Sequence, residues 1–375
     1  MQPVIDITSH QELDASDEHH LQRYSALALS SLICVPFAIR AAIKLGVFEI
    51  IAEAGPDAYL SPAEIADKIP TNNANKARAL ERILRMLVTN SILKTTRRAG
   101  DGEGQKPQVT YGLGKLGEYL VAGPPGTSIA PLQQLAVDKV IINCLYHLED
   151  AILDPDCEPF VKAHGKSLFE YLGEDLRFNK VFHEAMRSGS VIATNVIFDK
   201  YKGFEDAKEI VDVGGGTGAA VAEIVGKYPY IRGRNFDLPY VIANALKFPG
   251  VEHVAGNMFE SVPYSETIFM KYILHDWDDD QCVEILKNCW KALPVGGKVI
   301  DVDLVVPTKI ENGVKSLRVL ALDLHVMACC PRGRERTIEE YQYLGKAAGF
   351  AQVKGFPVAN DLHVIEFHKR LQPEK

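Results

Sequence analysis

The stretch that most constrains the fold is EIVDVGGGTG, residues 209–218, in which an apolar run passes directly into a turn with four glycines. The run predicts a buried β-strand, and the sequence AAVAEIVGKY after it predicts a helix. Glycine is required where the backbone takes a positive φ, or where a ligand approaches closer than a Cβ would allow. In an open α/β sheet such a turn lies at the carboxyl edge of the strands, where ligands bind. The stretch therefore predicts a ligand-binding α/β sheet.

Strand-like runs alternate with helical patterns from Glu209 onward, which is typical of a mainly parallel sheet. We expect a Rossmann-like α/β domain over residues 126–375. Between the fourth and fifth strands the sequence has one apolar helical face, and Asp278 with Gln281 is suited to cap the start of that helix. The expected strands cover residues 209–213, 232–236, 251–255, 266–273, 298–305, 350–357 and 362–368.

Residues 21–125 have a helical pattern instead. Ser61 precedes a proline and is suited to cap a helix. Further along, SILKTT and VTYGLG flank a polar, glycine-rich tip and predict a β-hairpin. The order helix, helix, hairpin predicts a winged-helix-like domain, whose simplest role is to pack against a partner chain.

The first 44 residues carry two further expectations. Residues 1–20 are acidic and polar and lack the features of a secretory signal, so we expect a disordered tail. The longest apolar stretch, YSALALSSLICVPFAIRAAI from Tyr24, contains Pro36 and Arg40 and predicts a buried helical hairpin rather than a bilayer span. No membrane partner is expected.

The charge balance bears on a rival interpretation, that the winged-helix-like region binds DNA. Arg78, Arg82 and Arg85 would then contact phosphates. The net charge of −8 opposes binding that depends on neutralising phosphates, and Glu81 interrupts the basic face. We therefore expect no nucleic acid as a partner, and a small molecule instead.

The seven cysteines include no CxxC pair, and their number is odd. This pattern fits neither a disulfide framework nor a zinc site. We expect a reducing, cytoplasmic location and no bound metal.

Asp237 follows Gly218 by 19 residues, at the end of the next expected strand. From there a carboxylate can accept hydrogen bonds from ribose hydroxyls, so the sequence predicts a cofactor that contains adenosine. Gly214, Gly216 and Ala219 also satisfy the loose dinucleotide pattern. The glycines alone leave S-adenosylmethionine and NAD as alternatives, and with NAD an oxidoreductase.

Further motifs separate these alternatives. Read together, NFDLP at 235–239, GNMF at 256–259, FMKYILHDWDDD at 269–280 and GRERT at 333–337 resemble the plant phenolic O-methyltransferases that use S-adenosylmethionine and no metal. The resemblance covers nearly the whole chain and implies a homodimer formed through the amino-terminal domain. Residues 32–71 and the ending LHVIEFHK look most like the benzylisoquinoline alkaloid branch of that family, with phenylpropanoid and flavonoid methylation as the alternative.

The resemblance also implies a role for each matching residue. It implies that S-adenosylmethionine is bound, and S-adenosylhomocysteine released, by Ser190, Gly214, Gly216, Asp237, Leu238, Asn257, Met258, Lys271 and Trp277. It implies an acceptor pocket that includes Met186, Asp276, Val326 and Cys330. It implies His275 as the catalytic base, flanked by the carboxylates of Asp303 and Glu335.

The chemistry of the expected reaction agrees with a histidine base. A phenol has a pKa near 10, so only about one molecule in a thousand is ionised at pH 7. Histidine is suited to remove the proton.

The sequence departs from the family pattern at two of these positions. Asp303 replaces the usual glutamate, and Asn257 replaces an aspartate that faces the adenine.

Overall fold

The computed structural model describes residues 15–99, 107–124, 126–330, 332–359 and 361–370, and these form two compact units. The first unit runs to Asp138 and the second begins at Lys139, whereas the sequence placed the division near residue 125. Most of the expected disordered tail, residues 1–14, lies outside the described residues. Residues 15–20 are helical and correct that expectation, since the first helix begins at Ala15.

The first unit has the predicted winged-helix order. Its helix α4 begins after Ser61, whose side chain accepts a hydrogen bond from Glu64 N–H while the Glu64 side chain accepts one from Ser61 N–H. Strands β1 and β2 form an antiparallel hairpin, as expected. The elements are α1 (Ala15–Ser31), α2 (Cys34–Lys44), α3 (Val47–Glu53), α4 (Pro62–Asp67), α5 (Lys76–Val88), β1 (Leu93–Arg98), β2 (Gln108–Leu113), α6 (Lys115–Glu118) and α7 (Ala130–Ala136).

The apolar stretch that begins at Tyr24 is not a buried hairpin. It forms the end of α1 and most of α2, and several of its large side chains are exposed in the single chain, among them Leu27 at 61% and Ile33 at 60%. Over Gln22–Lys44 it is long and apolar enough to cross a bilayer, and only 11% of the most apolar window is buried. The sequence pattern could not show this exposure, because it depends on what packs against the helix.

The second unit is built on a seven-stranded sheet with the order β5-β4-β3-β6-β7-β9-β8. All pairs are parallel except those made by β9, which is antiparallel to β7 and β8. This is the Rossmann-like arrangement predicted from the sequence. The strands are β3 (Glu209–Val213), β4 (Arg232–Asp237), β5 (Val251–Ala255), β6 (Thr267–Lys271), β7 (Lys298–Leu304), β8 (Gln352–Pro357) and β9 (Leu362–His368).

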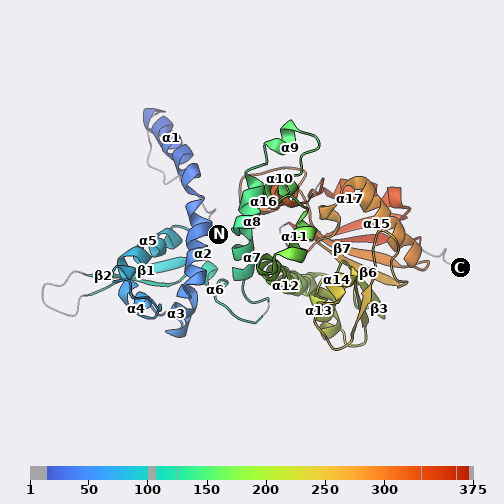
Figure 1. The fold of residues 1–375 in the computed structure, drawn as a ribbon, viewed down its shortest axis with the longest axis horizontal. Coiled ribbons are helices and arrows are strands. Elements are labelled where there is room, and N and C mark those ends of the chain that lie inside the picture. Colours follow the sequence, from blue (N-terminus) through green and yellow to red (C-terminus); the bar gives the residue numbers. More distant parts are fainter. Residues whose placement is uncertain (1–14, 100–106, 125, 331, 360, 371–375) are drawn as a thin grey trace. The chain divides into compact units, whose positions relative to one another are not determined.

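Helices cover both faces of this sheet (Figure 1). One apolar cluster joins the sheet to α15 and α17, and a second joins the other face to α12, α13 and α16. The helices of the unit are α8 (Lys139–Leu145), α9 (Asp150–Leu153), α10 (Pro159–His164), α11 (Leu168–Glu174), α12 (Leu176–Lys200), α13 (Ala219–Lys227), α14 (Pro239–Ile242), the 3-10 turn η1 (Leu274–Asp276), α15 (Asp279–Ala292), α16 (Val314–Cys329) and α17 (Ile338–Ala348).

Side chains of β7 alternate between these two clusters. Val299 lies in the α15 and α17 cluster, whereas Ile300, Val302 and Leu304 lie in the α12, α13 and α16 cluster. Because side chains in a strand point alternately to the two faces, Asp301 and Asp303 share the face of Val299. The carboxyl ends of β3, β4, β6 and β7 meet at one edge of the sheet.

Candidate active site

The glycine turn follows β3 at this edge and has the positive-φ backbone that its sequence predicts. Gly214, Gly216 and Gly218 have φ of 69°, 58° and 83°. A Cβ at Gly216 would point into open space, so the backbone beside it is accessible to a ligand. At Gly215 a Cβ would instead collide with Asp212 and Asn235, which explains glycine at this position by packing.

Asp237 ends the neighbouring strand β4 and turns its carboxylate toward the glycine turn. One oxygen accepts a hydrogen bond from Gly216 N–H at 2.8 Å, and the other accepts one from Leu238 N–H at 2.7 Å. Burial raises the pKa of Asp237, and the two backbone hydrogen bonds oppose this rise. A carboxylate oxygen has two lone pairs, so each still has capacity for a hydroxyl donor. The site therefore fits the ribose of an adenosine cofactor.

Lys271 lies at the end of β6 between the glycine turn and the end of β7. Its ammonium group is 4.3 Å from the centre of the Tyr272 ring. Burial lowers the pKa of Lys271 to about 8, against the opposing charges of Asp212 and Asp303. A partly buried cation at this edge is suited to an anionic part of a ligand.

His275 lies in η1, directly after β6, and is 8% exposed. Its Nδ1 is 2.9 Å from Glu335 Oε1 and 4.0 Å from Asp303 Oδ1. Its Nε2 is 3.4 Å from Asp276 Oδ1. The three residues expected to cooperate in catalysis thus come together from distant parts of the sequence, with Glu335 in hydrogen-bonding contact and Asp303 farther away.

The charges around His275 determine its affinity for a proton. Burial lowers the pKa of His275, but the charges of Asp276 and Asp303 and the hydrogen bond to Glu335 outweigh burial and raise the pKa to about 10. Since Glu335 accepts a hydrogen bond from Nδ1–H, the neutral ring has its lone pair on Nε2. Nε2 is therefore the nitrogen that can accept a proton.

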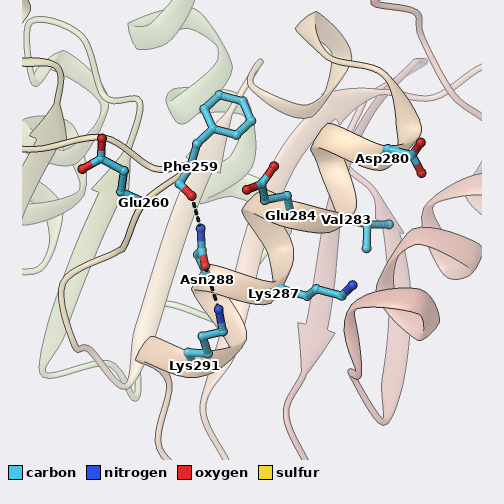
Figure 2. Close-up of a pocket in the computed structure, with 8 residues that line it drawn as sticks. All are labelled: Phe259, Glu260, Asp280, Val283, Glu284, Lys287, Asn288 and Lys291. Carbon is cyan, nitrogen blue, oxygen red and sulfur yellow. Dashed lines mark hydrogen bonds between the residues drawn. The ribbon is translucent and has the colours of Figure 1, made fainter.

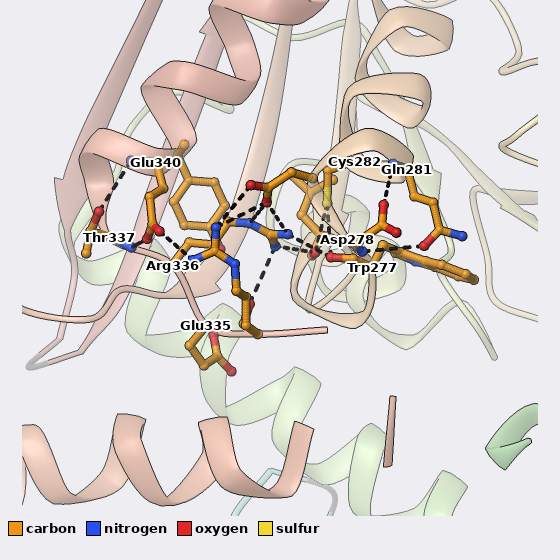
Figure 3. Close-up of polar contacts among 12 residues, drawn as sticks. Trp277, Asp278, Gln281, Cys282, Glu335, Arg336, Thr337 and Glu340 are labelled. Atoms are coloured by element: carbon orange, nitrogen blue, oxygen red, sulfur yellow. Dashed lines mark hydrogen bonds and ion pairs between the residues drawn. The ribbon is translucent and has the colours of Figure 1, made fainter. Parts of the chain in front are cut away.

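Arg336 fixes the backbone that holds His275 (Figure 3). Its guanidinium is fully buried and donates to the carbonyl oxygens of Leu274 and Trp277, each at 2.7 Å. It also contacts Asp279 Oδ1 through two nitrogens, at 3.0 and 2.9 Å. Asp278 caps α15 as predicted, by accepting a hydrogen bond from Gln281 N–H. These contacts determine the path of the chain on either side of His275.

The other expected cofactor residues make contacts of several kinds within the protein. Asn257 uses its side-chain oxygen to accept a hydrogen bond from Phe259 N–H, so its amide is engaged within its own turn. Trp277 packs edge-on against Phe259 at 4.7 Å between ring centroids. The Ser190 hydroxyl donates to Met186 C=O within α12, at 2.7 Å. Met258 and Leu238 are the remaining two, and Met258 packs against the α15 and α17 cluster.

The expected acceptor residues divide into a polar and an apolar part. Cys330 donates a hydrogen bond through its thiol to Asp276 Oδ1 at 3.1 Å, the same oxygen that faces His275 Nε2. Val326 is buried on α16, and Met186 is partly buried on α12. The Cys330 thiol and His275 therefore both contact the Asp276 oxygen that lies beside the base.

Two residues near His275 were not found from the sequence. Tyr272 has φ of 56°, which is rare for a residue with a side chain, and its ring stacks on His275 at 5.6 Å with an interplanar angle of 22°. Asp301 is fully buried on β7, two residues before Asp303. The alternation of DVD within an apolar strand was the available signal for Asp301, because it puts both carboxylates on one face.

A hollow of about 550 Å³ lies on the outer face of α15 and contains none of the expected site residues (Figure 2). Its lining is largely charged, with Glu260, Asp280 and Glu284 near Lys287 and Lys291.

Among the described residues, no group of three or more His, Cys, Asp or Glu side chains is arranged to hold a metal ion.

Two family models match the chain. The O-methyltransferase domain matches residues 145–351, and the O-methyltransferase dimerisation domain matches residues 27–123. The second match includes most of the exposed apolar stretch of α1 and α2. It therefore supports the expectation that the first unit packs against another chain.

Relatives of nearly full length agree with both models. The chain is 47% identical to an (S)-scoulerine 9-O-methyltransferase of Coptis japonica, over 98% of this chain and 94% of the relative. It is 46% identical to a caffeic acid 3-O-methyltransferase of Prunus dulcis, over 92% of this chain and 94% of the relative. In fold it matches CalO1, a methyltransferase of calicheamicin biosynthesis in its SAH-bound form, with a TM-score of 0.75 and 25% identity over 96% of this chain and 100% of the other.

These matches exclude the oxidoreductase and DNA-binding interpretations as descriptions of the whole chain. The two family models together cover most of it, and the relatives align across both units. The chain therefore belongs to the plant S-adenosylmethionine-dependent O-methyltransferases of the caffeic acid O-methyltransferase-like family.

Proposed function

We propose that this enzyme methylates a phenolic hydroxyl of a benzylisoquinoline or protoberberine alkaloid such as scoulerine, with His275 as the general base and without a metal. The observation that carries the role of His275 is its contact with Glu335, because this contact leaves Nε2 free to accept a proton. The alkaloid class rests on the similarity to the Coptis japonica enzyme over both units.

Each group at the edge of the sheet has a definite task in this proposal. Bound S-adenosylmethionine supplies a methyl group activated by a positively charged sulfur. Asp237 and the glycine turn would hold this cofactor, and the acceptor residues would hold the phenol beside it. Positioning of this kind contributes roughly 7–11 kcal/mol to lowering a barrier.

His275 Nε2 removes the phenol proton as the oxygen attacks. Glu335 holds the ring in the correct tautomer and, with Asp303, stabilises the imidazolium that forms. The raised pKa of His275, about 10, is close to the reference value of a phenol, so the proton passes between groups of similar affinity.

The alkaloid class also agrees with the charge of the protein. A protoberberine acceptor has flat apolar rings and a basic nitrogen that is cationic near neutral pH. Met186 and Val326 are suited to the rings, and methionine adapts readily to aromatic surfaces. A protein of net charge −8 accommodates the cation better than a basic protein would.

Caffeic acid is the second candidate acceptor, because a relative named for it is 46% identical. The test compares kcat/KM for scoulerine, caffeic acid and a flavonoid with the same labelled cofactor. We expect the highest value for scoulerine, and no turnover of an analogue with every hydroxyl methylated. A preference for caffeic acid would contradict the alkaloid proposal and leave the methyltransferase activity intact, whereas loss of activity with a chelator would contradict the metal-free mechanism.

A further inference from the structure

Asp301 is a carboxylate in an apolar environment. It is fully buried in the middle of β7, where its partners in register are Met270 of β6 and Ile365 of β9. Neither of its oxygens has a hydrogen-bond partner among the described residues. A buried charge without a partner costs far more free energy than a protonated, hydrogen-bonded acid.

Asp303 is the group that Asp301 can reach. It lies two residues later on the same face of β7 and is also fully buried, so the two carboxylates are neighbours in the same apolar cluster. Asp303 Oδ2 accepts a hydrogen bond from the Tyr341 hydroxyl at 3.1 Å, whereas Oδ1 has no donor. Two ionised carboxylates are both acceptors, so they can form a hydrogen bond only if one of them carries a proton.

The surroundings determine which carboxylate carries it. Burial raises the pKa of Asp303 to about 7, and the cationic form of His275, 4.0 Å away, and the hydrogen bond from Tyr341 oppose a larger rise. For Asp301, burial and the charge of Asp303 raise the pKa well above its ordinary value, with weaker opposition from His275 and Arg336. The titratable and charged groups around the pair are Lys271 at the end of β6 and Tyr272 after it, His275 and Asp276 in η1, Cys282 and Cys289 in α15, Glu335 and Arg336 before α17, and Tyr341 in α17.

We propose that Asp301 is a positioning residue that carries the single proton of the Asp301–Asp303 pair and donates it in a hydrogen bond to Asp303, which keeps Asp303 ionised beside His275. Asp301 touches neither cofactor nor acceptor and acts only through Asp303. The inference rests on the proposed role of His275 as the base. The two aspartates of the DVD sequence in β7 thus have different roles: Asp301 carries the proton, and its hydrogen bond keeps Asp303 ionised.

The test measures proton binding at His275 directly, in the full-length enzyme with isotope-labelled histidine. The His275 resonance is assigned by its absence from a His275→Gln variant. Asp301→Asn keeps a neutral donor of the same shape and should leave the pKa of His275 as it is in the unmodified enzyme. Asp301→Leu removes the donor, so Asp303 takes up a proton and proton binding at His275 weakens about tenfold or more.

A matched control is Ile285→Val, which removes a methylene from the same apolar cluster without altering a charge. It should leave the His275 titration unchanged. A lower His275 pKa in Asp301→Asn would show that Asp301 is ionised in the unmodified enzyme. An unchanged His275 pKa in Asp301→Leu would show that the Asp301 side chain only fills space. A change in Ile285→Val would assign the effect to packing, and each of these three results overturns the proposal. Full activity of His275→Gln would instead contradict the role of His275 as the base. Failure of the Asp301 proposal and failure of the proposed function are therefore distinguishable.

Discussion

His275 experiences opposing effects at the scale of single residues. Burial weakens its proton affinity, and three neighbouring carboxylates strengthen it more. The result is a base whose affinity matches that of a phenol but which is largely protonated at neutral pH. The ring can act as a base only in its neutral form, so the rate must depend on pH across the range in which His275 loses its proton.

We therefore predict that kcat/KM rises with pH from neutrality toward about 10, because the fraction of neutral His275 rises over that range. His275→Gln should lower kcat at neutral pH by about 10²- to 10⁴-fold, the usual contribution of general base catalysis, while cofactor binding persists. The residual rate of the variant should follow only the ionisation of the phenol itself. The measurement is a pH profile of initial rates with a cofactor titration by calorimetry. A profile that is already flat at pH 7 would show that the charge of His275 does not limit the reaction.

Stability provides an independent check of the same group. A histidine with a raised pKa stabilises the fold fully below its unfolded value of about 6.5, and this contribution is lost as the pH rises through the folded value of about 10. The free energy of unfolding of the unmodified enzyme should thus fall more steeply between these pH values than that of His275→Gln. Parallel curves would contradict the raised pKa.

At the scale of elements, the site depends on how the segment 274–279 is held between β6 and α15. Arg336 donates to two backbone carbonyl oxygens of this segment and to Asp279, and it is fully buried. Arg334 lies two residues earlier and also contacts Asp279, at 3.1 Å, but its side chain is 40% exposed. The two arginines therefore form a matched pair that differs in burial.

We predict that Arg336→Met destabilises the protein and lowers kcat, whereas Arg334→Met has little effect on either. The two carbonyl oxygens would keep only the weak thiol donor of Cys282, and poorly satisfied buried acceptors cost about 1–3 kcal/mol each. The loosened segment would also displace His275 from Glu335. An exposed ion pair such as that of Arg334 contributes only about 0–1 kcal/mol. Chemical denaturation and steady-state rates measure both effects, and equal losses in the two variants would refute the special role of Arg336.

The sequence predicted elements better than their contacts. The glycine turn, the strands of the sheet and the caps Ser61 and Asp278 follow from local patterns, and the structure confirms them. The contacts of Arg336 could not be predicted in this way, because they join segments 57 to 62 residues apart that meet only in the folded protein. Periodicity shows which face a side chain occupies, but not which distant group lies opposite.

At the scale of the whole molecule, the exposed apolar side chains of α1 and α2 need a partner. The large side chains Leu27, Leu29 and Ile33 are each at least 60% exposed in the single chain. Apolar patches of this kind mark a protein interface or a membrane-binding surface. The stretch is long and apolar enough for a bilayer, yet it overlaps the match to the dimerisation domain at residues 27–123.

We predict that this surface is covered by a second copy of the chain, so the enzyme is a homodimer in solution. Leu27→Asp with Ile33→Asp puts two charges into the interface and should produce monomers, because burying an unpaired charge costs several kcal/mol. The matched control is Val295→Asp, which changes a 58% exposed side chain of the second unit and should leave the dimer intact. Analytical ultracentrifugation gives the mass, and flotation with phosphatidylcholine vesicles tests the alternative. If the double variant is still dimeric, the apolar face is not the dimer interface. If the unmodified protein floats with the vesicles and the two aspartates abolish this flotation, the face binds a membrane instead.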